Sequence, residues 1–305
     1  MTTATFPTAI SRPAGLPVDW KERAAGWAGT ALSAAVLLLI AHQLGRGGLG
    51  RLAGAAAAGS LGFWIVFAVA YLASPLCEWA IFARLWRLPA AGIAALLRKE
   101  VSNELLFGYS GEASFYLWAR RHVTMAGSPF GAVKDVAVLS ALAGNIATLA
   151  LMAANTHALA RFAGTPGAKA FAGSIAVIVG ISLALFLFRR AVFSLSTRQL
   201  AQVFGIHLVR IALHVGLSAL MWHLLAPAVP LAAWMGLATL RQMISRLPLV
   251  SNKDILFAGA AVLLLGQGNG AADVIATVST LIVGAHLLVG FLSYAAPLAA
   301  RLRGR

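Results

Sequence analysis

Acidic and basic side chains occur together in two otherwise apolar stretches of the chain, residues 90–118 and 231–266. An ionised side chain at the centre of a bilayer costs about 2.5–3.5 kcal/mol, so such residues pair with one another or serve a ligand. Carboxylates accept protons or bind cationic groups, whereas the planar Arg guanidinium holds two phosphate oxygens at once. These two stretches are therefore the first candidates for a binding site.

In the first stretch, Glu100 and Glu104 are four residues apart and share one face of a helix. One interpretation places a carboxylate in a polar cavity, where it pairs with a cationic group or takes up a proton. The other places Glu100 at the membrane interface, paired with neighbouring Lys and Arg. We take as candidate binding residues Glu104, Glu112, which stands beside a Gly-rich turn, and Arg120.

The second stretch contains Arg241, Arg246, Lys253 and Asp254, and all four are candidate binding residues. Arg241 and Arg246 are the first choice for a phosphate group. The alternative is that both reach the interface and only set topology. Asp254 is also explained by a plain ion pair with Lys253 or Arg246.

A polar stripe runs along one apolar segment, with His207, Arg210, His214 and Ser218 at positions i, i+3, i+7 and i+11. In a membrane this face must point into the helix bundle or a wet cavity. His207 and His214 are suited to relay protons, because imidazole titrates near neutral pH. No carboxylate joins them on that helix, so we expect no metal site.

Two further ionisable residues have plainer explanations. His286 lies on an apolar face and predicts a hydrogen-bonded packing residue. Glu78 lies about two helical turns before Arg84 and Arg87, which predicts an ion pair at the interface.

The composition assigns the chain to the helical membrane proteins. Of its 305 residues 60% are hydrophobic and only 11% charged, against about 25% charged residues in soluble domains; the mean hydropathy is +0.84. The net charge of +15 resides in segments between apolar blocks, where it sets topology and attracts anionic lipids. We find no nucleic-acid motif, and the single Cys77 excludes a disulfide within the chain.

The apolar blocks predict an all-α polytopic fold. About six segments approach the roughly 20 residues needed to cross a bilayer: 26–44, 61–83, 136–154, 171–188, 204–226 and 272–298. We expect a cytoplasmic segment at 1–25, a single transmembrane domain at 26–298 and a basic tail at 299–305. The two charged stretches then form re-entrant helical hairpins near 90–118 and 231–266.

The distribution of Lys and Arg predicts the orientation. The richest segments fall on the cytoplasmic side when both termini are cytoplasmic. The hairpins then enter the membrane from opposite sides. With an offset of 142 residues, Lys99 falls on Arg241 and Glu112 on Asp254, which suggests an inverted repeat. Short, interrupted segments at corresponding positions are typical of a transporter site near the midplane.

No enzyme motif stands out in the chain. HExxH, GxSxG and a nucleotide-binding loop are all absent from it. We therefore expect no enzyme activity, no cofactor and no ATP use by this chain.

Two segments resemble the signatures of a known family. KEVSNELLFGYSGEASFYLWARR at 99–121 and LPLVSNKDILFAG at 247–259 are similar to two motifs of the flippase-like integral membrane family, which is related to the transmembrane region of lysylphosphatidylglycerol synthases. The chain departs from the family at Phe107–Gly108, where Pro–Gly is usual, and at 251–253, where Gly is usual.

The resemblance implies translocation of a lipid across the bacterial inner membrane, and the basic residues favour an anionic headgroup. It does not imply synthesis of an aminoacyl lipid, because no transferase domain is fused to the chain. The alternative is a non-catalytic accessory or scaffold subunit of a cell-envelope lipid or glycan biosynthesis system. A homo-oligomer and an envelope-biosynthesis partner both stay open.

Overall fold

The computed structural model describes residues 48–57, 59–105, 110–123, 129–154, 192–244 and 270–303, together with positions 176, 179, 180, 182, 183, 187, 254, 257–259 and 261. All regular secondary structure in this part of the chain is helical. The helices are α2 (Gly48–Ala57), α3 (Leu61–Trp86), α4 (Gly92–Leu105), α5 (Ser110–His122), α6 (Pro129–Ala154), α10 (Thr197–Leu225), α11 (Leu231–Ile244) and α13 (Gly270–Arg303).

Four of these helices, α3, α6, α10 and α13, are long and apolar enough to cross a membrane. They coincide with the predicted segments 61–83, 136–154, 204–226 and 272–298 and extend beyond them. Capping explains part of the extension. Ser196 caps α10 in a capping box with Gln199, so the helix starts among polar residues. The predicted spans at 26–44 and, except for single helical positions, 171–188 lie outside the described residues.

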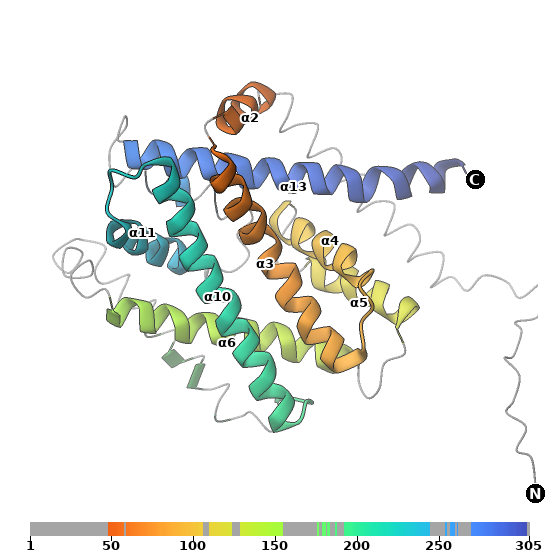
Figure 1. Ribbon diagram of the computed structural model, residues 1–305. Coiled ribbons are helices and arrows are strands. Elements are labelled where there is room, and N and C mark those ends of the chain that lie inside the picture. The colour runs from red at the N-terminus through yellow and green to blue at the C-terminus, as the bar shows by residue number, and fades with distance from the viewer. Residues whose placement is uncertain are drawn as a thin grey trace, which may run out of the picture.

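Helix α10 is the centre of the packing. It contacts α3, α6, α11 and α13. It runs beside α3 in the middle of the molecule, where α13 crosses near its upper end and α6 crosses about halfway along it (Figure 1). Trp222 of α10 packs against Trp234 of α11 and stacks with Phe257, at ring centroid distances of 5.8 and 5.6 Å. Burial of these large aromatic side chains fixes α11 against α10.

The first predicted hairpin consists of two short helices, α4 and α5, with 14 and 13 residues. Each is shorter than the roughly 20 residues that cross a bilayer. They pack against each other; α4 also contacts α3 and α13, and α5 contacts α6. Phe115 of α5 lies 4.8 Å from Phe82 of α3, centroid to centroid. Of the second predicted hairpin, the structure describes α11 and helical positions at 254, 257–259 and 261.

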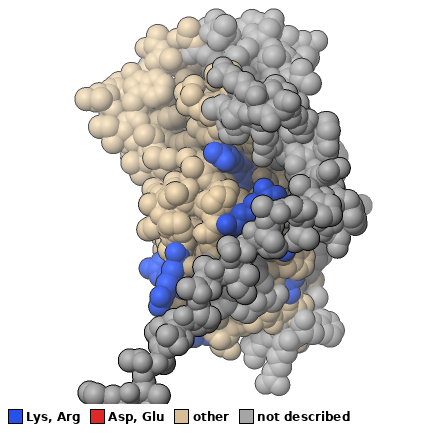
Figure 2. Space-filling view, turned by 90° about the vertical axis from the view of Figure 1, so that its right-hand side faces the viewer, with Lys and Arg blue, Asp and Glu red and all other residues tan. Residues whose placement is uncertain are grey.

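Charge and apolar surface are segregated in the described part of the chain. Leu61, Ile65 and Val69 follow one face of α3 and are 79%, 57% and 51% exposed, as expected of a lipid-facing stripe. Five arginines are exposed, whereas every described carboxylate except Asp273 is buried or half-buried. Figure 2 shows a face with several Lys and Arg and no Asp or Glu visible among its described residues. Apart from Asp273, the described acidic groups are therefore inside the bundle.

Gly111 allows the close approach of α4 and α5. A Cβ atom at this position would overlap the backbone carbonyl of Lys99. By contrast, a Cβ atom at Gly205 of α10 would meet nothing within 4 Å. The α4–α5 contact thus depends on a missing side chain.

We predict that Gly111→Ala lowers the stability of the purified protein by about 1–3 kcal/mol or more, because the two helices must separate to admit the methyl group. Gly205→Ala is the matched control and should leave stability unchanged or slightly raised, because Ala favours helix. Apparent melting temperatures in detergent measure both effects. Equal melting temperatures for the two variants would show that α4 and α5 do not depend on this contact.

Candidate functional site

A cavity of about 180 Å³ lies among α3, α4, α10, α11 and α13. Its described lining combines apolar side chains with an unusual number of polar ones. The polar lining residues are Tyr71, Ser74, Glu100, Glu104, Arg210, His214, Ser218, Arg241, Gln242, Asp254 and His286. The cavity collects residues from both charged stretches, although these stretches are more than 100 residues apart in the chain.

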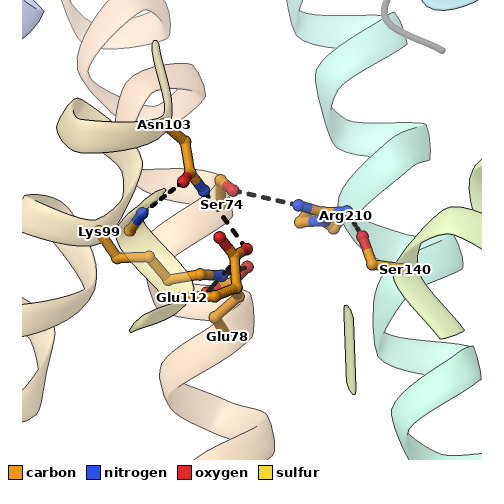
Figure 3. A network of polar contacts seen from close by, with 8 residues as sticks. Ser74, Glu78, Lys99, Asn103, Glu112, Ser140 and Arg210 are labelled. Atoms are coloured by element: carbon orange, nitrogen blue, oxygen red, sulfur yellow. Dashed lines mark hydrogen bonds and ion pairs between the residues drawn. The ribbon is translucent and has the colours of Figure 1, made fainter. Parts of the chain in front are cut away.

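Arg210 is held between two neighbouring helices. Its Nη1 donates to Ser74 Oγ of α3 at 3.3 Å, and its Nη2 donates to Ser140 Oγ of α6 at 2.8 Å (Figure 3). Its Nε is buried and has no hydrogen-bond partner among the described residues. The guanidinium is thus positioned by two neutral hydroxyl groups, which leave its positive charge without a counter-ion in these contacts.

Arg241 is bound to an acid. Its Nε and Nη2 contact the same oxygen of Asp254, Oδ1, at 2.7 and 2.6 Å, and its Nη1 donates to Ser218 Oγ at 3.3 Å. Asp254 therefore forms an ion pair with Arg241; Lys253 and Arg246, the partners that one interpretation of the sequence gave it, lie outside the described residues. Because both contacts go to the same carboxylate oxygen, the Arg241–Asp254 pair is not the bidentate arrangement in which each oxygen accepts one bond.

A second cluster of charges lies beside the cavity, where α4 meets α3 and α5. Lys99 is buried, and its Nζ donates to both oxygens of Glu78 at 2.7 and 2.6 Å; Glu112 Oε1 lies 3.3 Å away (Figure 3). Asn103 donates to the same Glu112 oxygen at 3.3 Å and accepts from the Gly111 amide at 2.7 Å. The prediction of an interfacial ion pair for Glu78 is wrong, because its partner is Lys99 inside the bundle.

The two charged stretches, 90–118 and 231–266, share one feature of their ion pairs. Lys99 pairs with Glu112 in the first, and Arg241 pairs with Asp254 in the second. The two cations and the two acids are the residues that the offset of 142 places on one another. The structure thus puts a salt bridge with the same 13-residue spacing at corresponding positions of the two stretches.

The histidines separate into two groups. His214 and His286 line the cavity, and His286 Nδ1 lies 3.0 Å from the hydroxyl of Tyr71. His207 is fully buried and is not among the lining residues. Arg210, His214 and Ser218 thus face the cavity, as the helical spacing predicts, while His207 packs inside the bundle.

The remaining candidates lie elsewhere. Glu112 belongs to the Lys99 cluster and does not line the cavity. Arg120 is exposed, and its guanidinium carbon lies 5.8 Å from the ring centroid of Tyr116. Arg246 and Lys253 lie outside the described residues. In the described part of the chain no group of three His, Cys, Asp or Glu residues is placed to hold a metal ion.

The sequence interpretation missed several lining residues, chiefly Tyr71 and Ser74 on α3 and Gln242 on α11. A signal for the first two was present. Tyr71, Ser74 and Glu78 stand at i, i+3 and i+7, which is the same spacing that indicated the stripe on α10. His286 had been assigned to packing; it does form a hydrogen bond, but it also lines the cavity.

Comparison with known proteins identifies no relative from which a function could be inferred. The chain matches no family model, and no curated protein or solved structure is significantly similar to it. Function must therefore be argued from the cavity and its charges.

We predict that Glu78→Gln destabilises the protein much more than Glu112→Gln does. Breaking a buried ion pair costs about 3–5 kcal/mol, and Glu78 makes two short contacts with Lys99, where Glu112 makes one longer contact. Apparent melting temperatures in detergent measure the loss of stability in each variant. The two variants serve as each other's control. A larger loss for Glu112→Gln would show that Glu112, and not Glu78, holds Lys99.

Proposed function

We propose that this chain translocates a lipid with an anionic headgroup across the membrane. The observation that carries the proposal is a polar cavity with two guanidinium groups, Arg210 and Arg241, inside a bundle of membrane-spanning helices. Charged groups within a membrane are costly and mark ligand or ion pathways. A purely structural cavity would gain nothing from them.

The size of the cavity supports a headgroup as the occupant. A volume of about 180 Å³ equals roughly six water molecules at about 30 Å³ each. That space accommodates a phosphate and a small substituent. The acyl chains then stay outside, against the exposed apolar side chains of the spanning helices.

Arg210 is the best-suited phosphate ligand. Its two hydroxyl partners position the guanidinium without neutralising it, and guanidinium binds phosphate oxygens through charge-assisted hydrogen bonds. Arg241 contributes a second donor group, and its partner Asp254 holds it at the cavity wall.

Alternating access supplies the mechanism. We propose six spans and two oppositely oriented re-entrant hairpins, with both termini in the cytoplasm of a bacterial cell. The corresponding salt bridges, Lys99–Glu112 and Arg241–Asp254, support an inverted repeat. In transporters built this way, rocking of one repeat against the other exposes a midplane site to each side in turn.

We predict that the purified protein in liposomes translocates fluorescent anionic phospholipid, and that Arg210→Ala slows this about tenfold or more. A hydrogen bond to a charged group contributes about 1.5–3 kcal/mol, and 1.4 kcal/mol corresponds to tenfold. Dithionite quenching of the outer leaflet measures the rate, and Arg241→Ala should behave alike. Zwitterionic lipid should move more slowly than anionic lipid.

Arg120→Ala is the matched control, because Arg120 is exposed and outside the cavity; it should translocate lipid as the wild type does. Each variant must first elute as the wild type does in size exclusion. Absence of lipid movement by the well-folded wild type would contradict the proposal and favour an accessory subunit of an envelope biosynthesis system.

A further inference from the structure

The carboxylates on the cavity wall differ in their partners. Asp254 and Arg241 neutralise each other, and Glu104 also takes part in an interaction. Glu100 lies one helical turn before Glu104 on α4 and lines the same cavity. A negative charge without a partner in such a place opposes the entry of an anionic headgroup.

Glu100 stands out among these carboxylates. The charged clusters around it are engaged: Glu78 and Glu112 with Lys99, and Asp254 with Arg241. No described residue forms a hydrogen bond or ion pair with Glu100 itself. Two carboxylates in one site disfavour double ionisation, because like charges repel in a poorly hydrated environment. Protonation of Glu100 removes both this repulsion and its own negative charge.

Every element packed around α4 contributes groups to this environment. On α4 itself they are Arg98, Lys99 and Glu104. The neighbouring elements contribute Tyr71 and Glu78 from α3, Glu112 from α5, His207, Arg210 and His214 from α10, Arg241 from α11, and His286 and Tyr294 from α13, with Asp254 beyond α11. The cations among them are Arg98, Lys99, Arg210 and Arg241, and none of these four forms a hydrogen bond or ion pair with the Glu100 carboxyl.

We propose that the carboxyl group of Glu100 is a proton-binding site in the cavity, and that its proton accompanies the anionic headgroup through the membrane. The proton comes from water that enters the cavity, forms the O–H bond of the acid, and returns to water on the other side. With Glu100 neutral, its carboxyl group no longer opposes the phosphate that Arg210 attracts. The coupling to lipid rests on the proposed function; the proton site does not.

Infrared spectroscopy of the purified protein in D2O tests the site directly. Wild-type protein at neutral pH should show the C=O stretching band of a protonated carboxyl group, and this band should be lost in Glu100→Gln. Glu112→Gln is the matched control, because Glu112 contacts Lys99 and does not line the cavity. The band should persist in this variant. A band that survives in Glu100→Gln would overturn the proposal.

Glu100→Asp keeps an acid at the site and serves as the second variant. Its carboxyl band should be shifted in frequency from the wild-type band, which assigns the band to this position even when Glu100→Gln does not fold. An unshifted band in Glu100→Asp would place the proton on another residue and overturn the proposal.

The liposome assay tests the coupling. Wild-type translocation of anionic lipid should speed up as the pH falls, because protonation removes the negative charge of Glu100. In Glu100→Gln, which mimics the neutral acid, translocation should be retained and independent of pH. A pH-dependent rate in Glu100→Gln would overturn the coupling. If the wild type moves no lipid but the band is lost in Glu100→Gln, the proposed function fails and the proton site stands.

Discussion

A buried ammonium group determines where the first hairpin lies. Lys99 of α4 is held by both oxygens of Glu78 on α3 and contacts Glu112 on α5, so one side chain ties three helices together. A charge in the interior of a membrane protein is tolerated only with such partners. The same contact requires glycine at position 111, because a Cβ atom there would overlap the Lys99 carbonyl. Electrostatics and steric fit therefore select one position for the hairpin.

The cavity follows from that position. With α4 fixed against α3, Glu100 and Glu104 face the helices that carry Arg210 and Arg241, and the space between them is polar. Two serines, Ser74 and Ser140, position Arg210 without neutralising its charge. The outer faces of the same helices are apolar. A polar interior with a lipid-facing exterior is the arrangement that a headgroup pathway requires.

Much of this arrangement was predictable from periodicity. The spacing of Arg210, His214 and Ser218 indicates one helical face, and the four spanning helices coincide with apolar blocks. The partner of each charge was not predictable, because pairs such as Lys99 with Glu78 or Arg241 with Ser218 join segments whose packing depends on the whole bundle. Glu78 shows this: its nearest basic residues in sequence lie towards the helix end, whereas its partner comes from α4. The other two ion pairs, Lys99 with Glu112 and Arg241 with Asp254, each join residues 13 apart within one charged stretch. The offset of 142 aligns these residues, but it did not predict that they pair.

The most direct test of a headgroup pathway is to find where the headgroup binds. Anionic phospholipid with a photoreactive group on its headgroup would be crosslinked to the protein in liposomes, and the modified residues identified by mass spectrometry. We expect modification of cavity residues on α10 and α4, such as His214, Ser218 and Glu104. Modification confined to outward-facing residues of the same helix, such as Val209 and Leu213, would mean that the headgroup never enters the cavity and would contradict the account.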